Sequence, residues 1–103
     1  MTVLTSFEFK GDPDQLLKDK NEKVDPIFMD VAPDKGFIAH MVARSDDGLV
    51  VFNVWESLEA SEKVADIVRP QAMALGLPAP TNWKVYELVQ REGALAPTAG
   101  SRS

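Results

Sequence analysis

The sequence contains no cysteine and a single histidine, His40. Without cysteine there are no disulfides, thiolate nucleophiles or cysteine-ligated zinc and iron–sulfur centres, and one histidine cannot form a histidine-rich metal site. The chain also lacks a Gly-rich phosphate-binding loop and a serine–histidine–aspartate set. We therefore expect neither a metal nor a cofactor.

Positive charge and long apolar runs are also scarce. Sixteen acidic residues against 11 basic ones give a net charge of −5, which opposes the phosphate neutralisation that nucleic-acid binding requires. No apolar run approaches the roughly 18 residues that cross a bilayer, and the first residues do not resemble a secretory signal. We expect a cytoplasmic protein that binds neither nucleic acid nor a membrane.

The composition is that of a globular protein, with 45% hydrophobic and 26% charged residues in a chain of 103 residues. This length accommodates one domain. We expect the folded domain to cover residues 1–92. Residues 93–103 are rich in alanine, glycine and serine without periodicity, which predicts a flexible C-terminal tail.

Apolar residues at a spacing of two predict the strands. The first strand covers residues 2–10, where Val3, Phe7 and Phe9 alternate with charged residues. Valine-rich and aromatic segments bounded by turn residues predict three more strands, at residues 36–44, 49–55 and 82–89.

Apolar residues at helical spacing predict two helices. The first covers residues 13–31 and begins after the candidate N-cap Asp12, and Pro26 should kink or divide it. The second begins after Ser57 and stops at Gly76.

Two charged segments have structural interpretations. Residues 18–23 alternate lysine with acidic or amide residues and are typical of the solvated side of a helix. Asp46 and Asp47 indicate a turn, because no third oxygen ligand for a metal is nearby in the sequence.

The element order βαββαβ predicts an α+β, ferredoxin-like fold. Right-handed crossovers place both helices on one face of a four-stranded antiparallel sheet. The other face is then left uncovered by the chain itself.

The pairing of the two middle strands decides which residues occupy each face. A two-residue turn at Asp47 and Gly48 pairs Ser45 with Val50. The wholly apolar set is then expected beneath the helices: Phe37, Ala39, Met41, Ala43, Val50, Phe52 and Val54. The uncovered face carries a mixed set: Ile38, His40, Val42, Arg44, Leu49, Val51, Asn53 and Trp55.

The mixed face is still mostly apolar, and an exposed apolar patch of this kind predicts an interface. We expect a homodimer packed face to face, with a cavity between the sheets. A three-residue loop with a left-handed Gly48 is the alternative, and it would place Asn53 and Trp55 beneath the helices.

His40, Asn53 and Trp55 are the candidate catalytic residues, because the preferred pairing brings them together with His40 opposite Trp55. An imidazole transfers protons near neutral pH, an amide stabilises an oxyanion, and an indole forms a flat wall for an aromatic ligand. Each also has a structural interpretation, as a hydrogen-bonded strand residue or as dimer core. The candidate substrate-binding residues share their face: Ile38, Val42, Arg44 and Val51.

The segments 36–40 and 50–60 resemble the antibiotic biosynthesis monooxygenase-like family of the dimeric α+β barrel superfamily, above all in the stretch from Trp55 to Ala60. This resemblance implies a ferredoxin-like subunit paired into a barrel, with a ligand cavity in each subunit. Some members oxidise polyketide-derived phenols with molecular oxygen and no cofactor, through an asparagine and a tryptophan that would correspond to Asn53 and Trp55. Haem-degrading members carry a histidine ten positions after the tryptophan, where this chain has Ala65.

The sequence thus predicts a small cofactor-independent monooxygenase-like protein that binds an aromatic or polyketide-like substrate between the sheet and the dimer partner. Two alternatives remain open. One is a polyketide cyclase or isomerase that acts by proton transfer alone, and the other is a non-catalytic dimeric module for ligand binding or an accessory role.

Overall fold

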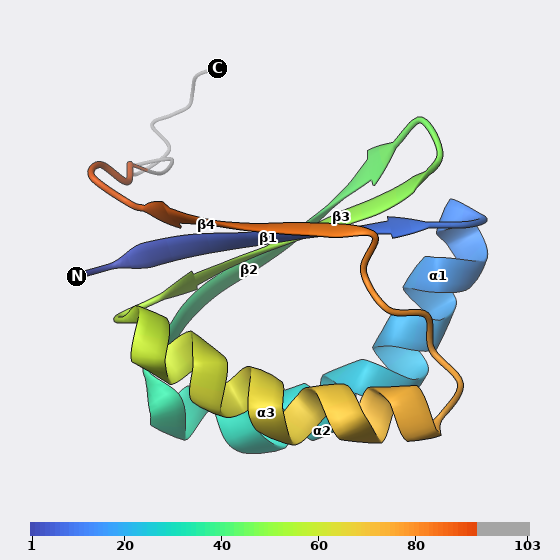
Figure 1. The fold of residues 1–103 in the computed structure, drawn as a ribbon, viewed down its shortest axis with the longest axis horizontal. Coiled ribbons are helices and arrows are strands. Elements are labelled where there is room, and N and C mark those ends of the chain that lie inside the picture. Colours follow the sequence, from blue (N-terminus) through green and yellow to red (C-terminus); the bar gives the residue numbers. More distant parts are fainter. Residues whose placement is uncertain (93–103) are drawn as a thin grey trace, which may run out of the picture.

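A computed structural model describes residues 1–92 of the chain, so the predicted tail at 93–103 lies outside the described residues. Four antiparallel strands form one sheet in the order β2-β3-β1-β4. Their bounds are Val3–Lys10 (β1), Phe37–Ser45 (β2), Gly48–Trp55 (β3) and Asn82–Glu87 (β4). The helices lie together on one face of this sheet (Figure 1). The predicted ferredoxin-like α+β fold is confirmed.

The first helical segment is divided, as the position of Pro26 predicts. It runs through α1 (Pro13–Asp19), a π-helical turn η1 (Lys20–Val24), α2 (Asp25–Val31) and a short 3-10 turn η2 (Ala32–Lys35). Proline has no N–H and crowds the carbonyl four residues before it in an α-helix. The wider π turn just before Pro26 relieves this crowding, and there the Asp25 N–H donates to the Lys20 carbonyl five residues back.

The helix ends follow the capping residues of the sequence. Asp12 caps α1 by accepting a hydrogen bond from the Gln15 N–H, and Ser57 caps α3 (Leu58–Ala74) by accepting one from the Ala60 N–H at 3.1 Å. Gly76 follows α3 with a left-handed φ of 83°, the conformation that ends many helices. No helix among residues 1–92 is long and apolar enough to cross a bilayer.

The hairpin turn lies one residue earlier than predicted. Ser45 pairs with Gly48, so the turn residues are Asp46 and Asp47. His40 therefore lies opposite Asn53, and not opposite Trp55. The shift in pairing is two residues, which leaves the grouping of β2 and β3 residues by face unchanged between Ala39 and Ser45.

Gly48 is needed for close packing and not for a left-handed turn. Its φ is not positive, which excludes the alternative loop. A Cβ at this position would lie only 1.8 Å from the Phe9 carbonyl oxygen of β1. The absence of a side chain therefore lets β3 begin directly beside the end of β1.

The helices cover the face opposite to the one predicted. Leu49, Val51, Asn53 and Trp55 are buried, and all four line the space between the sheet and the helices. Except for Phe37, the apolar set expected beneath the helices lies on the open face instead, where Met41 is 48% exposed. The prediction that His40, Asn53 and Trp55 occupy the uncovered face was therefore wrong.

A β-bulge between Phe37 and Ala39 separates the start of β2 from this pattern. The extra residue, Ile38, lets Phe37 lie opposite Trp55 and contact it edge to face, with ring centroids 5.5 Å apart. Ile38 itself is 37% exposed. A bulge reverses the alternation of side chains, and this is why Phe37 joins the helix side of the sheet.

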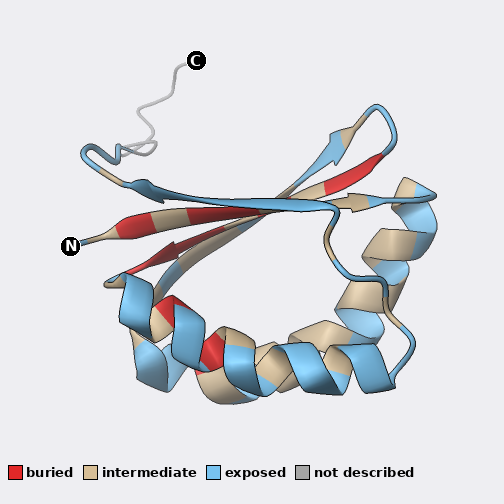
Figure 2. Ribbon diagram, viewed as in Figure 1, coloured by how far each residue is buried: buried red, intermediate tan, exposed pale blue. Residues whose placement is uncertain are grey.

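The core is small and lies at one end of the molecule. Val3, Ala32, Trp55 and Val64 form its buried cluster. Figure 2 shows the buried positions on the central strands and on one side of α3, whereas β4 is exposed along its whole length. The rest of the space between sheet and helices is a cavity.

Candidate functional site

A cavity of about 610 Å³ lies between the sheet and the helices of the single chain. This volume is in the range of small-molecule sites, and most of the lining is apolar, as such sites require. The sheet contributes ten lining residues: Thr5, Phe7, Phe9, His40, Leu49, Val51, Asn53, Trp55, Trp83 and Val85. The sequence predicts a cavity between the sheet and a dimer partner, whereas this cavity lies within the subunit.

One row of residues across the sheet supplies the polar part of this surface. Val85, Thr5, Asn53 and His40 are paired in sequence across β4, β1, β3 and β2. Thr5 and Asn53 are 3% and 6% exposed. The rows on either side are Val3–Trp55–Phe37 and Phe7–Val51–Val42, so the polar row lies within apolar surroundings.

The His40 imidazole is held by Asn53. Its Nδ1 lies 2.6 Å from Asn53 Oδ1. An amide oxygen can only accept, so Nδ1 carries the hydrogen and the lone pair of the neutral ring is on Nε2. Asn53 therefore fixes both the orientation and the tautomer of His40, which is a role different from the oxyanion donor that the sequence suggested for it.

The second ring nitrogen, His40 Nε2, is buried without a hydrogen-bond partner among residues 1–92. A buried acceptor without a partner costs about 1–3 kcal/mol, and such groups are rare in folded proteins. The Phe28 ring packs on the imidazole with centroids 5.8 Å apart. A ligand hydroxyl that reached Nε2 with a small turn of the covering side chains would satisfy this acceptor.

Trp55 occupies the apolar end of the cavity. It is 2% exposed and meets Phe28 and Phe37 edge to face, with centroids 5.9 and 5.5 Å away. The structure thus places Trp55 in the core of one chain and not in a dimer interface. Because Trp55 lies beside the polar row, it packs in the core and also forms part of the cavity wall.

The four candidate binding residues are not brought together. Val51 lines the cavity, whereas Ile38, Val42 and Arg44 are not among its lining residues. The bulge directs Ile38 elsewhere, and Arg44 forms an ion pair with Asp14 at the N-terminal end of α1. Only Val51 of this predicted group therefore belongs to the site.

Sequence reasoning missed several lining residues. Trp83 is 60% exposed, lines the cavity and stacks on Phe7 with centroids 6.4 Å apart. Lys20 and Asp25 also line it and form an ion pair at 2.8 Å. From the sequence, the stretch containing Lys20 is interpreted as a solvated helix face, although Lys20 follows Leu16, another lining residue, at the helical spacing of four. The π turn that brings Asp25 to the same side leaves no signal in the sequence except Pro26.

No protein-family model matches the chain, and no curated protein matches its sequence. Solved structures do match its fold. SnoaB, a cofactor-independent oxygenase from Streptomyces nogalater, is 19% identical, with a TM-score of 0.59 over 87% of this chain and 93% of its own. A dimeric ferredoxin-like protein from an uncultured marine organism is 13% identical, with a TM-score of 0.59 over 87% of this chain and 92% of its own.

The monooxygenase ActVA-Orf6 of Streptomyces coelicolor, in complex with nanaomycin D, matches as well, with 21% identity and a TM-score of 0.53 over 91% of this chain and 89% of its own. At these identities the matches establish the fold. The resemblance to antibiotic biosynthesis monooxygenases is therefore confirmed at the level of the fold.

Proposed function

We propose that this protein is a cofactor-independent monooxygenase that binds an aromatic, polyketide-like molecule in the cavity beneath its sheet. The observation that carries the proposal is the His40–Asn53 pair, a hydrogen-bonded base with a free nitrogen at the side of a mostly apolar cavity. Structural neighbours that are named as oxygenases give the proposal its reaction class.

His40 acts as the base in this proposal. Its Nε2 takes the proton of a phenolic hydroxyl, and the resulting anion is rich enough in electrons to react with molecular oxygen. One oxygen atom enters the substrate as a carbonyl, and the other leaves as water with two hydrogens from the substrate. The protein contributes a positioned base and a dry pocket, and the substrate supplies the electrons.

Asn53 orients His40 through its Oδ1, and its amide nitrogen remains available to donate to the anion. This nitrogen makes no hydrogen bond to another residue among residues 1–92, because the Asn53 side chain contacts His40 through Oδ1 alone. Trp55 and Trp83 offer aromatic surfaces at two places in the cavity. Stacking on such surfaces favours a planar ligand.

The open face of the sheet supports a homodimer. Leu4, Met41, Phe52 and Tyr86 form an apolar patch on this face, and the polar residues Glu8, Asn82 and Lys84 lie beside it. Met41 and Tyr86 are 48% and 47% exposed. A second copy packed on this face would bury it with two-fold symmetry, leaving the cavity of each subunit on the other side of its own sheet.

The test measures oxygen consumption with an aromatic hydroquinone. It compares the purified wild-type protein with the variants His40→Ala and Asn53→Ala. Each substitution should lower turnover about 10²-fold or more, the usual scale for a lost base or its orienting group. Product formation without oxygen uptake would favour the cyclase or isomerase. Binding without turnover in the wild type would favour the accessory module. Full activity of both variants would remove the roles assigned here.

A further inference from the structure

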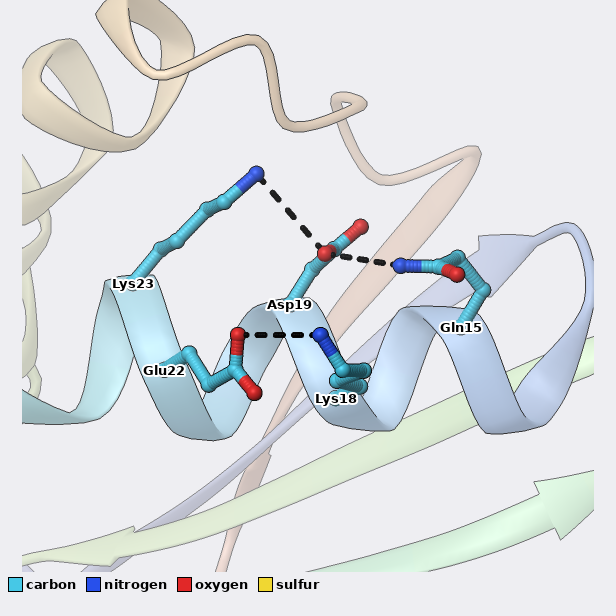
Figure 3. A network of polar contacts seen from close by, with 5 residues as sticks. All are labelled: Gln15, Lys18, Asp19, Glu22 and Lys23. Atoms are coloured by element: carbon cyan, nitrogen blue, oxygen red, sulfur yellow. Dashed lines mark hydrogen bonds and ion pairs between the residues drawn. The ribbon is translucent and has the colours of Figure 1, made fainter.

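The Lys20–Asp25 ion pair has no part in the proposed reaction, yet it lines the same cavity. Lys20 Nζ lies 2.8 Å from Asp25 Oδ1, and the Lys20 side chain is only 14% exposed. The same helical segment holds two other ion pairs, Lys18–Glu22 and Lys23–Asp19 (Figure 3). Their lysine side chains are 63% and 43% exposed, far more than Lys20. The inner pair is therefore distinct from the surface pairs beside it.

The π turn creates this pair. Residues five apart lie on different sides of an α-helix, because each residue turns the chain by about 100°. In η1 the hydrogen bond runs from the Asp25 N–H to the Lys20 carbonyl five residues back, so the two side chains come together on the inner side. π turns inside α-helices are frequent at functional sites.

Lys20 retains donors for a ligand. A lysine ammonium has three N–H donors, and Asp25 is its one recorded partner among residues 1–92. Five charged residues line the cavity: Lys20, Asp25, Glu62, Asp66 and Arg69. Three of them are acidic and two are basic, which disfavours a carboxylate ligand. A neutral carbonyl or hydroxyl oxygen is the matching acceptor.

The pair lies away from His40. Phe28, which packs on the imidazole, follows Lys20 by eight residues along the same helical segment. An α-helical rise of 1.5 Å per residue gives at most about 12 Å between the two backbone positions, because the π turn at Lys20–Val24 is wider and shorter than an α-helical turn. A ligand that reaches both places carries one oxygen toward Lys20 and another toward His40.

We propose that the Lys20–Asp25 pair is a second polar anchor that selects extended multi-ring ligands with a neutral oxygen at the end remote from His40. This inference rests on the proposed function, since it assumes that the cavity binds a planar aromatic molecule. Lys20 donates to the remote oxygen, and Asp25 is a positioning residue that holds the ammonium in place.

The experiment compares two probes, 2,6-dihydroxyanthraquinone with hydroxyls at both ends and 2-hydroxyanthraquinone with one, by calorimetric titration. A hydrogen bond to a charged group should give the wild type an affinity about tenfold higher for the first probe. Lys20→Met should abolish this preference and leave the affinity for the second probe unchanged. Lys18→Met is the matched control, and it should preserve both affinities, because Lys18 is exposed.

Lys20→Met leaves the Asp25 carboxylate without its ion-pair partner, which could prevent folding. A second variant avoids this problem. Lys20→Met combined with Asp25→Leu removes both charges, a replacement that proteins often tolerate, and it too should lose the preference. Equal binding of the two probes by the wild type, or a preference that survives either variant, would overturn the anchor and leave the proposed function standing. Failure of the wild type to bind either probe would overturn both.

Discussion

The two faces of the sheet carry different chemistry. The face beneath the helices holds the polar row of Thr5, Asn53 and His40 and encloses a cavity. The open face is apolar on the β2–β3 hairpin, with Met41, Phe52 and Val54, but on β1 it carries Ser6, Glu8 and Lys10. A covered face is usually the more apolar one, because burial of apolar area drives packing. On the hairpin this order is reversed, since the two residues whose side chains hydrogen-bond to each other, His40 and Asn53, lie on the covered side.

This difference has an energetic counterpart. On the covered face, stability comes from the cluster around Trp55 and Val64 at one end, and the cavity beside it contributes little. On the open face, Val54 is buried within the chain, whereas Met41 and Tyr86 are 48% and 47% exposed. The apolar area of these two side chains would add stability only in the proposed dimer, and that contribution would depend on protein concentration. Substitutions on the two faces should therefore change different measurements.

The largest effect is expected for Trp55→Ala on the covered face. Truncation of a buried aromatic side chain costs about 3–5 kcal/mol, and Trp55 is 2% exposed between two phenylalanine rings. The measurement is chemical unfolding. The matched open-face variant Phe52→Ala should cost clearly less under conditions where the chain is monomeric, and an equal cost would show that the faces do not differ in this way.

Phe52→Lys should abolish the dimer with little change in the fold of the subunit. A lysine at the centre of the open face would place an unpaired charge between the two sheets, which should weaken association about 100-fold or more. Sedimentation over a range of concentrations measures this. Val51→Lys, one residue away on the covered face, should instead lower the melting temperature. The opposite pattern would mean that the dimer uses the other face.

Replacing both members of the polar pair should separate stability from function. His40→Phe combined with Asn53→Leu removes the imidazole, including its orphaned Nε2, together with the Asn53 amide that contacts Nδ1, and such double replacements are often nearly neutral. We expect an unfolding free energy within about 1 kcal/mol of the wild type and no oxygen consumption. A strong loss of stability would identify the pair as structural.

The smallest effect is expected for Thr5→Val, in the same row. The Thr5 hydroxyl donates to the main-chain carbonyl oxygen of Asn53 at 3.5 Å. This distance is the outer limit of a hydrogen bond. Loss of this contact should change the unfolding free energy by less than about 1 kcal/mol, as denaturant unfolding would show. A larger loss would indicate that the row acts as one connected network.

The sequence was sufficient for the element order because the signals are local. Alternation at period two marks β1, side-chain caps mark the starts of α1 and α3, and Gly76 marks the end of α3. Pro26 indicated where the first helix would divide. None of these features depends on which face of the sheet the helices cover.

The prediction of the covered face is wrong because it rests on β2 and β3 alone, where the apolar set lies on the open side. Placing the more apolar face beneath the helices is sound when every strand is included. The apolar residues of β1, Val3, Phe7 and Phe9, pair with the covered residues of β3, and Ser6 and Glu8 lie on the open side. The bulge at Ile38 and the close approach at Gly48 are likewise set by neighbouring strands and are not encoded locally.

The candidate site was partly predictable for the same reason. His40 and Asn53 were grouped correctly, since neighbouring strands and side-chain alternation determine that they share a face. Their direct hydrogen bond required the true turn position. Lys20 and Asp25 required the π turn, which depends on how the helical segment accommodates Pro26 against the sheet.

The π turn also bears on how this chain can change in length. A π turn accommodates one residue more than the α-helical path around it, so deleting one residue within Lys20–Val24 would restore a regular helix. The helices on either side would keep their faces, because 11 residues at about 100° each bring Leu16 and Phe28 to nearly the same side of a regular helix. Both would still line the cavity. The deletion would instead remove the hydrogen bond between residues five apart that brings Asp25 to Lys20. We therefore expect that a chain shortened by one residue here would keep the fold and lose the ion pair.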